Sequence, residues 1–516
     1  MTNKKIISIL ALFLVLFVAV GAASAADDIA VSDVNDGFDA GVPVLNDGVS
    51  DQNGTFADLQ SIIDGKNPGD TVILDKNYVY KDGSDSGVTG ITINKALTID
   101  GNGTILDGSD ISRILTVTSS DVIVKNIKFI NGCTDDCGGA IFTNYNLIVD
   151  NCTFINNKAR GITASGSDGF GGAIAFYGKN GKLLNSKFEN NTARCAGAVR
   201  FAYTGLVENC SFINNKAIDP EGISTASVYG GALYLSSSNI KVLNCDFKDN
   251  YANVYGGAIA VTKKYSNFVI DNCNFDNNTS PSGGAIYINQ IDNINVTNSV
   301  FTNNKASLGG SGIYVIGLKD STQSLNFISC SFINNSESAL FLKESCDNAV
   351  VNYCIFENNS GAIEFKYTAN FNYDNNYYAL AKGETFNMGL FKNAGSWTQK
   401  APNNWVVIDI DANDVVKFVL NDGTELTESM PDYDVNVDVK YADGTTESGV
   451  KTIVDNELSF DKDLKHINVV TNSGKTLLSE DLLLKTVYIS KDGVDTNDGT
   501  IADPVATLEK ALTLVR

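Results

Sequence analysis

Hydrophobic and polar positions alternate in short bursts along most of the chain, and one such burst recurs nine times. Clear copies read LIVDNCTFINNKA from Leu147, LVENCSFINNKA from Leu206 and FVIDNCNFDNNTS from Phe268. In most copies a small residue and a Phe stand two positions apart, which in a β-strand directs both side chains to the same face. The nine Phe residues are Phe129, Phe154, Phe188, Phe212, Phe247, Phe275, Phe301, Phe332 and Phe356, at steps of 24 to 35 residues. A repeat of this length indicates a solenoid, a propeller or another array.

Two kinds of corner separate the expected strands of each unit. After the Phe, most units continue into Asn-Asn, and Asn tolerates left-handed turns and can bond to its copy in the next coil. We therefore expect a ladder formed by Asn156, Asn190, Asn214, Asn277, Asn303, Asn334 and Asn358. A glycine pair then precedes a short apolar run, as in GGAI at Gly138 and Gly171. Since no long run keeps helical spacing, the pattern predicts a right-handed parallel β-helix.

A family resemblance rests on the combination of NCxFxNNxA with GGAI. It resembles the pectate-lyase-like β-helix repeats of archaeal adhesin-like surface proteins, which are similar in pattern to bacterial polymorphic outer-membrane proteins. The resemblance covers residues from about Phe56 to Asn376. It implies a β-helix rod on a cell surface, but the same fold hosts many different sites, so it does not identify the ligand.

The flanking segments predict further parts. Residues 1–25 read as a signal peptide, with Lys4 and Lys5, an apolar core and a cleavage site at Ala23-Ser24-Ala25; an uncleaved anchor is the alternative. Residues 26–54 form a polar segment. Residues 55–395 form the expected β-helix, and a helix from Thr55 is expected to cover its first coil.

The C-terminal part changes pattern. Within residues 401–486, the apolar runs WVVIDI, VVKFVL, VNVDVKY and INVVT are separated by turn residues and predict a small immunoglobulin-like β-sandwich. Residues 487–516 resemble the start of a second β-helix. We therefore expect the sequence to be a fragment of a longer protein, the alternative being that this segment docks on another chain. The expected fold class is all-β: a parallel β-helix solenoid followed by a small sandwich.

The charge balance limits the class of partner. The chain has 60 acidic and 38 basic residues and a formal net charge of −22, which argues against nucleic acid and anionic lipid. Only five residues are arginine, which argues against phosphate or uronate recognition. The signal segment predicts a secreted or cell-surface location, with membrane contact only through that segment or a C-terminal anchor that the sequence lacks.

The ten cysteines divide into two groups. Neighbouring coils lie ~4.8 Å apart, whereas the Cβ atoms of a disulfide are ~3.8 Å apart. We therefore expect a structural column of inward-facing buried thiols at Cys152, Cys210, Cys245, Cys273, Cys330 and Cys354. Cys133, Cys137, Cys195 and Cys346 lie outside this column. Any disulfide would come from these four, and a zinc site is the other possibility.

Few residues suggest catalysis. The single His, His466, lies outside the solenoid. Asp135 and Asp136 are the best carboxylate pair for the acid and base of a hydrolase, and Arg194 and Arg200 could serve a uronate lyase. A solvated turn explains the two Asp residues better, and each Arg is more often an exposed coil residue.

Cofactors and modification have limited candidates. No cofactor is expected, although the loops Asp82 to Asp85 and Asp495 to Asp498 offer oxygen ligands to Ca²⁺; turn chemistry explains both. The N-x-S/T triplets predict a glycoprotein. Asn53 is a better acceptor than the ladder residues, whose side chains would be buried.

Three functions remain open. The first is an adhesin-like protein that presents a flank and the inserted segments 160–170, 218–229 and 318–324 to surface glycans or proteins of other cells. Tyr177, Tyr203, Tyr229 and Tyr255 could stack on sugar rings or simply cover the flank. The alternative is a polysaccharide lyase or hydrolase of the pectate-lyase-like class, and the third is a structural envelope protein.

Overall fold

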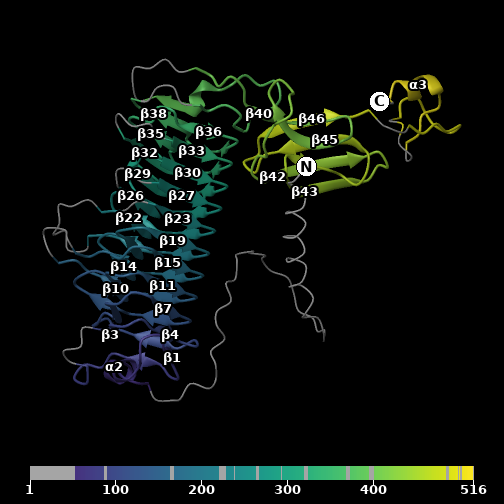
Figure 1. Ribbon diagram of the computed structural model, residues 1–516. Helices are drawn as coiled ribbons and strands as arrows, with labels where there is room; N and C mark the ends of the chain where they lie inside the picture. Colours follow the sequence, from purple (N-terminus) through teal and green to yellow (C-terminus); the bar gives the residue numbers. More distant parts are fainter. Residues whose placement is uncertain are drawn as a thin grey trace, which may run out of the picture. The chain divides into compact units, whose positions relative to one another are not determined.

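The computed structural model describes residues 53–514 apart from 86–89, 163–167, 220–227, 237–238, 263–266, 292, 319–323, 368–371, 394–399, 484–486, 498 and 500–502. The expected signal peptide and nearly all of the polar segment 26–54 lie outside the described residues, as do the tips of the three inserted segments. Each remaining part can be followed in Figure 1.

Three parallel sheets wind around one core and confirm the predicted right-handed β-helix (Figure 1). In a regular coil the chain passes through one strand of sheet B, one of sheet A and one of sheet C. Five successive coils add a two-residue strand to a smaller sheet D between A and C. The strands are so short because each coil must turn three times, and the polar Asn and Gly corners end each one.

The strand bounds follow the coils. Sheet B contains β1 (Thr71–Ile73), β4 (Thr98–Asp100), β7 (Val122–Lys125), β11 (Leu147–Asp150), β15 (Gly181–Leu184), β19 (Gly205–Glu208), β23 (Ile240–Leu243), β27 (Asn267–Asp271), β30 (Asn293–Thr297), β33 (Ser324–Ile328) and β36 (Val350–Asn352). Sheet A contains β2 (Tyr78–Val79), β5 (Ile105–Asp107), β8 (Lys128–Ile130), β12 (Thr153–Ile155), β16 (Lys187–Glu189), β20 (Ser211–Ile213), β24 (Asp246–Lys248), β28 (Asn274–Asp276), β31 (Val300–Thr302), β34 (Ser331–Ile333) and β37 (Ile355–Glu357).

The other two sheets complete the coils. Sheet C contains β3 (Ile91–Ile93), β6 (Leu115–Val117), β10 (Ile141–Thr143), β14 (Ile174–Phe176), β18 (Val199–Phe201), β22 (Leu233–Leu235), β26 (Ile259–Val261), β29 (Ile286–Ile291), β32 (Ile313–Gly317), β35 (Ser338–Leu342), β38 (Gly361–Phe365) and β39 (Phe391–Asn393). Sheet D contains β9 (Cys133–Thr134), β13 (Lys158–Ala159), β17 (Thr192–Ala193), β21 (Lys216–Ala217) and β25 (Tyr251–Ala252).

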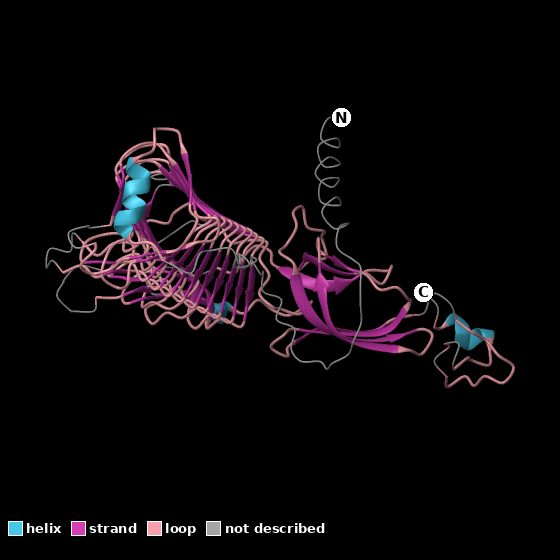
Figure 2. Cartoon of the chain, turned by 90° about the horizontal axis from the view of Figure 1, so that it is seen from below, coloured by secondary structure: helices cyan, strands magenta, loops and turns pink. Residues whose placement is uncertain are grey.

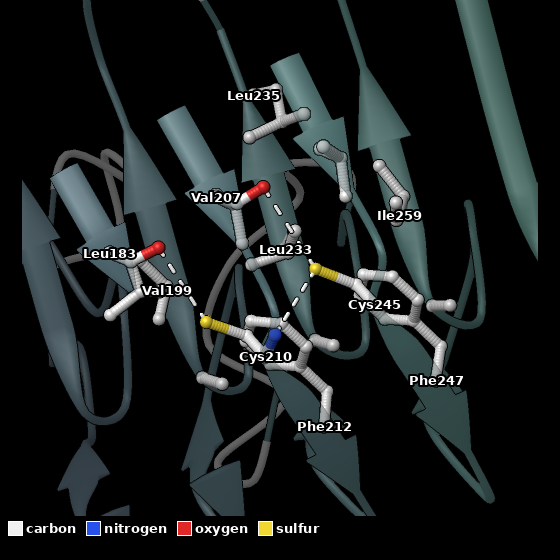
Figure 3. Close-up of a cluster of buried hydrophobic side chains, with 14 of the residues drawn as sticks. Leu183, Val199, Val207, Cys210, Phe212, Leu233, Leu235, Cys245, Phe247 and Ile259 are labelled. Atoms are coloured by element: carbon white, nitrogen blue, oxygen red, sulfur yellow. Dashed lines mark hydrogen bonds between the residues drawn. The ribbon is translucent and has the colours of Figure 1, made fainter. Parts of the chain in front are cut away.

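The core is a set of columns in which each residue type stacks on itself. The nine repeat Phe rings form a continuous stack with centroids 4.7 to 5.1 Å apart. Figure 3 shows Phe212 and Phe247 of sheet A facing Leu183 and Val207 of sheet B and aliphatic side chains of sheet C. Parallel register keeps like residues together, so one unit pattern packs every coil.

A buried asparagine ladder supports the corner after sheet A. It consists of Asn157, Asn191, Asn215, Asn250, Asn278, Asn304, Asn335 and Asn359. In each step the side-chain oxygen accepts bonds from the backbone and the side-chain amide of the Asn one coil earlier, as Asn215 does from Asn191 at 3.1 and 3.0 Å. All but Asn359 are buried.

The predicted ladder lies one residue earlier, and its side chains are half-buried or exposed. Its members Asn156, Asn190, Asn214, Asn277, Asn303, Asn334 and Asn358 take positive φ angles of 50° to 59°. This left-handed geometry turns the side chain outward, where some copies still bond to each other, as Asn358 does to Asn334. The expectation that these residues are buried was therefore wrong, because the residue that follows the bend points inward.

Both ends of the solenoid are covered. At the start, α2 (Phe56–Asp64) begins at the N-cap Thr55, and its buried Phe56, Leu59 and Ile63 join the core. Figure 2 shows α2 beside the first coils. At the other end, Tyr378 stacks on Phe356 with centroids 5.5 Å apart and contacts Phe386 and Phe391, next to the short 3₁₀ helix η1 (Met388–Leu390).

Two antiparallel sheets follow the solenoid and share one core. The first contains β40 (Val406–Ile410), β41 (Val416–Leu420) and β44 (Glu457–Leu458); the second contains β42 (Tyr433–Tyr441), β43 (Thr446–Ile453), β45 (Leu464–Val470) and β46 (Thr476–Asp481). We call them the C-terminal sheet pair. An immunoglobulin-like identity stays a prediction.

The C-terminal sheet pair is joined to the last coils by buried contacts. Tyr377 packs edge-on against Phe418 and Tyr433, with centroids 5.3 and 5.2 Å apart. The Tyr433 hydroxyl donates to the buried carboxylate of Glu357 at 2.9 Å. The solenoid end and the sheet pair therefore share part of one core.

The last segment contains a single short helix, α3 (Leu508–Leu512), whose Leu508 and Leu512 are exposed. Whether it begins a second β-helix stays a prediction. In the part of the chain that the structure describes, no helix has both the length and the apolar character to cross a membrane.

Candidate functional site

The outward positions of sheet C carry aromatic side chains, which the outward positions of the described strands of sheets A and B do not. The register aligns Phe142, Ala175, Arg200, Tyr234, Ala260, Tyr287, Tyr314, Phe341 and Glu364 in successive coils. We call Phe142, Tyr234, Tyr287, Tyr314 and Phe341 the aromatic row. A row of rings on one outer face distinguishes sheet C from its polar neighbours.

Arg200 of β18 lies among rings from neighbouring coils. Its guanidinium carbon is 3.9 Å from the ring centroid of Phe170, 4.7 Å from that of Tyr177 and 5.7 Å from that of Tyr234. These distances fit cation–π attraction, which offsets part of the loss of hydration. We call Arg200, Phe170, Tyr177 and Tyr234, with Cys137 beside them, the arginine cluster.

Tyr177 links two sides of the arginine cluster. Its hydroxyl accepts a hydrogen bond from Nη1 of Arg200 and lies 3.5 Å from the sulfur of Cys137. Burial raises the pKa of Tyr177, with a further contribution from Cys137, while Arg200 opposes the rise. Burial also raises the pKa of the Cys137 thiol. Both groups are therefore neutral at physiological pH, and Arg200 is the charged member of the cluster.

Arg194 was a candidate catalytic residue, but it is buried and holds the base of an inserted segment. Its guanidinium pairs with Asp168 at 3.3 Å and also donates to the carbonyl of Asp168. Its guanidinium carbon is 5.6 Å from the Phe170 ring. Arg194 thus positions Phe170 against Arg200, and its burial keeps it from touching a ligand.

Asp135 and Asp136, the candidate acid and base, lie at the edge of the arginine cluster and are each paired. Arg160 holds Asp135 at 2.7 Å, and Arg113 lies 3.5 Å from Asp136. Arg113 also donates to the carbonyls of Cys137 and Gly138. Of the four candidates, the structure brings Arg194 and Arg200 together on the Phe170 ring, whereas Asp135 and Asp136 are exposed and each pair with another arginine.

The aromatic row, together with Tyr229 and Tyr255 packed beside it, has a half-buried and a buried part. Tyr229 stacks between Tyr234 and Tyr255, with centroids 5.1 and 5.2 Å apart, and these rings are half-buried. Tyr287, Tyr314 and Phe341 pack together and are buried, and burial raises the pKa of Tyr314 to about 12. The later part of the row thus covers the flank of the solenoid, whereas the part near Arg200 is accessible. Tyr203, also expected to meet sugars, is 45 % exposed.

The six predicted column cysteines, Cys152, Cys210, Cys245, Cys273, Cys330 and Cys354, are buried free thiols. Figure 3 shows Cys210 and Cys245 pointing into the core, where the backbone amide of Cys210 donates to the sulfur of Cys245. Burial raises the pKa of Cys152 to about 12. Cys133, Cys137, Cys195 and Cys346 are also buried, and none of them is in a disulfide. Among the described residues, no cluster of His, Cys, Asp and Glu could hold a metal ion.

The two calcium candidates are helix caps. Asp85 is buried and accepts bonds from the amides of Phe56 and Ala57 at the start of α2. Asp495 accepts from the amides of Ala506 and Thr507 at the start of α3. Oxygen atoms of Asp85 and Asp495 therefore accept bonds from the backbone at helix starts. Asp498 lies outside the described residues.

A polar groove lies at the corner after sheet A. It is lined by Lys248, Asp249, Asp276, Asn277, Asn303, Lys305, Asn334 and Ser336. Its charges bond within the groove, with Lys248 3.6 Å from Asp276 and Lys305 donating to Asn277 at 2.9 Å. This corner repeats the ladder chemistry and adds no unpaired group.

Sequence reasoning overlooked Phe170 and Tyr234, although a signal for Tyr234 was present. When the units are aligned on GGAI and its variants GGAL and AGAV, the fifth position reads Phe142, Ala175, Arg200, Tyr234, Ala260 and Tyr287. That position alternates with the inward apolar residues, so it points outward. Phe170 lies at the end of an insertion and has no such repeat position.

Comparisons with known proteins give a family model and partial relatives. Metabotropic glutamate receptor-like protein R of Dictyostelium discoideum is 30% identical over 145 residues, which are 28% of this chain and 8% of that protein. Protein Q of the same series and organism is 31% identical over 244 residues, 40% of this chain and 20% of that protein. The chain spans about a fifth or less of the length of these curated relatives.

Two solved structures align with this chain at low identity. A PL6 alginate lyase in complex with a trisaccharide aligns over 73% of this chain and 93% of its own, with a TM-score of 0.42 and 12% identity. A tailspike protein of the E. coli bacteriophage HK620 in complex with a hexasaccharide aligns over 80% of this chain and 78% of its own, with a TM-score of 0.27 and 12% identity. Residues 165–281, which include Arg200 and Tyr234, match the family model described as a right handed beta helix region.

Proposed function

We propose that this chain is a secreted or cell-surface, adhesin-like protein that holds a glycan of another cell against the outer face of sheet C. The binding surface would be the arginine cluster together with the half-buried rings of Tyr229 and Tyr255. The secreted location rests on the signal-like residues 1–25, and the adhesin-like role on the repeat pattern.

One observation carries the proposal: among the described strands of sheets A, B and C, outward aromatic rings occur in sheet C alone, and Arg200 lies among them. Sugar rings present apolar C–H faces and polar hydroxyls, so protein sites for them combine aromatic rings with a few polar donors. Sheets A and B have outward Lys, Asn, Asp, Thr and Ser side chains among aliphatic ones, but no such combination.

Glycan binding by the full chain tests this proposal. We would measure binding to an array of microbial, plant and host glycans, then repeat it with Tyr234→Ala and with Lys241→Gln, an exposed residue on sheet B, as the matched control. We expect one group of glycans to bind, Tyr234→Ala to weaken that binding about tenfold and the control to leave it unchanged. Equal loss in both variants, or no glycan bound, would contradict the assignment and favour a structural envelope rod.

A polysaccharide lyase is the second candidate, favoured by the hydrogen bond between Arg200 and Tyr177. In β-elimination from a uronate, a base removes the proton next to the carboxylate, the electron pair forms the new double bond, and an acid protonates the departing oxygen. Tyr177, whose pKa is raised by burial, suits the acid, and Arg200 suits the carboxylate. Incubation of the chain with uronate polysaccharides, followed by the absorbance of the unsaturated product, distinguishes this reaction from binding.

A further inference from the structure

Arg200 is the one described arginine that no described carboxylate neutralises. Arg113, Arg160 and Arg194 pair with Asp136, Asp135 and Asp168. The described partners of the Arg200 guanidinium are the Tyr177 hydroxyl and the surrounding rings, and its buried Nε has no hydrogen-bond partner. This arrangement stands out in a chain with a net charge of −22, where carboxylates outnumber cations.

A guanidinium in this setting favours an anion. Its five N–H groups are built to meet two oxygen atoms in one plane, and a single one of them is used by Tyr177. The rings of Phe170, Tyr177 and Tyr234 reduce the local polarity, so a charge-assisted bond formed here is stronger than one in water. A carboxylate or a sulfate has the matching planar pair of oxygen atoms.

The rest of sheet C limits how many anions can bind. Beyond Arg200 the outward positions are Tyr234, Ala260, Tyr287, Tyr314 and Phe341, none of which is charged at neutral pH. The next is Glu364, six coils from Arg200 or ~29 Å at ~4.8 Å a coil, which repels anions. A ligand with a negative charge on every sugar would therefore meet one cation, a neutral stretch and then a carboxylate.

We propose that Arg200 binds the single carboxylate or sulfate group of an otherwise neutral glycan, whose uncharged sugars extend toward Tyr234 and Tyr229. This inference rests on the glycan-binding function proposed above and adds the charge pattern of the ligand. It places the anionic group at Arg200 of β18, one coil before Tyr234.

The test compares ligands that differ in charge alone. Oligosaccharides of glucose, galactose and mannose would be prepared neutral, with one carboxylate, with one sulfate and with a carboxylate on every sugar, and titrated into the full chain by calorimetry. We expect the singly charged forms to bind about 10- to 100-fold tighter than the neutral form. We also expect the fully charged form to bind less tightly than the singly charged one.

Variants separate the role of Arg200 from general electrostatics. Arg200→Gln should abolish the preference, so that this variant binds the singly charged form no tighter than the neutral form. Arg200→Lys, which keeps the charge but lacks the planar fork, should keep part of the preference and covers the case in which the Gln variant does not fold. Arg160→Gln removes an exposed arginine that pairs with Asp135 and serves as the control.

The outcomes are distinguishable. Equal binding of neutral and singly charged forms, or a preference that survives in Arg200→Gln, overturns the inference and leaves glycan binding in place. Tighter binding of the fully charged form overturns the single-anion pattern. No binding of any form overturns the proposed function itself. A selective preference for carboxylate over sulfate, or the reverse, identifies which group Arg200 recognises and supports the inference.

Discussion

Removal of one buried ladder amide tests how the corners of the solenoid are stabilised. We would replace Asn215 by Ala. Its side-chain oxygen accepts from the backbone and side-chain amides of Asn191 at 3.1 and 3.0 Å, and its own amide donates to Asn250 and to the Phe188 carbonyl, each at 3.0 Å. The substitution therefore removes four hydrogen bonds from a site with no solvent exposure.

The magnitude follows from the groups left without a partner. Asn191 keeps a backbone N–H and one side-chain N–H that no longer have an acceptor, and each buried orphan costs about 1–3 kcal/mol. We expect the free energy of unfolding to fall by about 4 kcal/mol. The matched control is Asn214→Gly in the same corner, since Asn214 is half-buried, has a φ of 53° that Gly adopts freely, and loses one bond to Asn190. We expect about 1 kcal/mol there.

Urea unfolding followed by far-ultraviolet circular dichroism measures both variants, and hydrogen exchange of peptides from residues 187–217 reports the corner itself. The local measurement is needed because a solenoid can open coil by coil, so that one global transition need not describe it. If Asn215→Ala lies within about 1 kcal/mol of Asn214→Gly and exchange is unchanged, the argument that the buried ladder stabilises the corner fails.

Three further predictions use other parts of the fold. A thiol reagent should modify no cysteine of the folded chain and ten after unfolding, because all ten are buried thiols outside any disulfide. Rapid modification of the folded protein would contradict the packing. Stability should fall as the pH rises from about 9 to 12, because burial raises the pKa of Cys152 from 9.0 to about 12 and that of Tyr78 from 10.0 to about 12. As the pH rises, these groups ionise first in the unfolded chain, which favours unfolding. Urea unfolding that is unchanged from pH 9 to 12 would refute this prediction. Tyr433→Phe should lower the free energy of unfolding by about 2 kcal/mol, because it removes a bond to the buried Glu357 carboxylate. Tyr488→Phe at an exposed site is the control and should leave stability unchanged. Equal stability of the two variants would contradict a core shared by the solenoid and the C-terminal sheet pair.

The repeat predicted the solenoid because its period is visible without knowledge of side-chain positions. The steps between Phe residues give the coil, and the pair NCxF gives the inward face. The ladder was displaced by one residue because Asn156 and Asn157 share the same period, and only the left-handed geometry of Asn156 decides which side chain enters the core. Sequence spacing holds no information on that choice.

The site was harder to predict because it joins repeat and non-repeat residues. The outward position of Arg200 and Tyr234 follows from alignment on the glycine pairs. The burial of Arg194 does not, because its partner Asp168 belongs to an insertion. The small number of arginines argued against anion recognition, yet Arg113, Arg160 and Arg194 each pair with an Asp, whereas Arg200 lies among aromatic rings.

In-register stacking also determines how such a chain can change its length. One coil runs from Phe188 to Phe212, and duplication of these 24 residues would supply a new copy of every column and ladder partner at once. The solenoid would grow by ~4.8 Å without a new core or a new corner. Adding one residue within a strand would instead move the following side chains to the opposite face. The length of the solenoid can therefore change by whole coils, while smaller insertions are confined to the corners between strands.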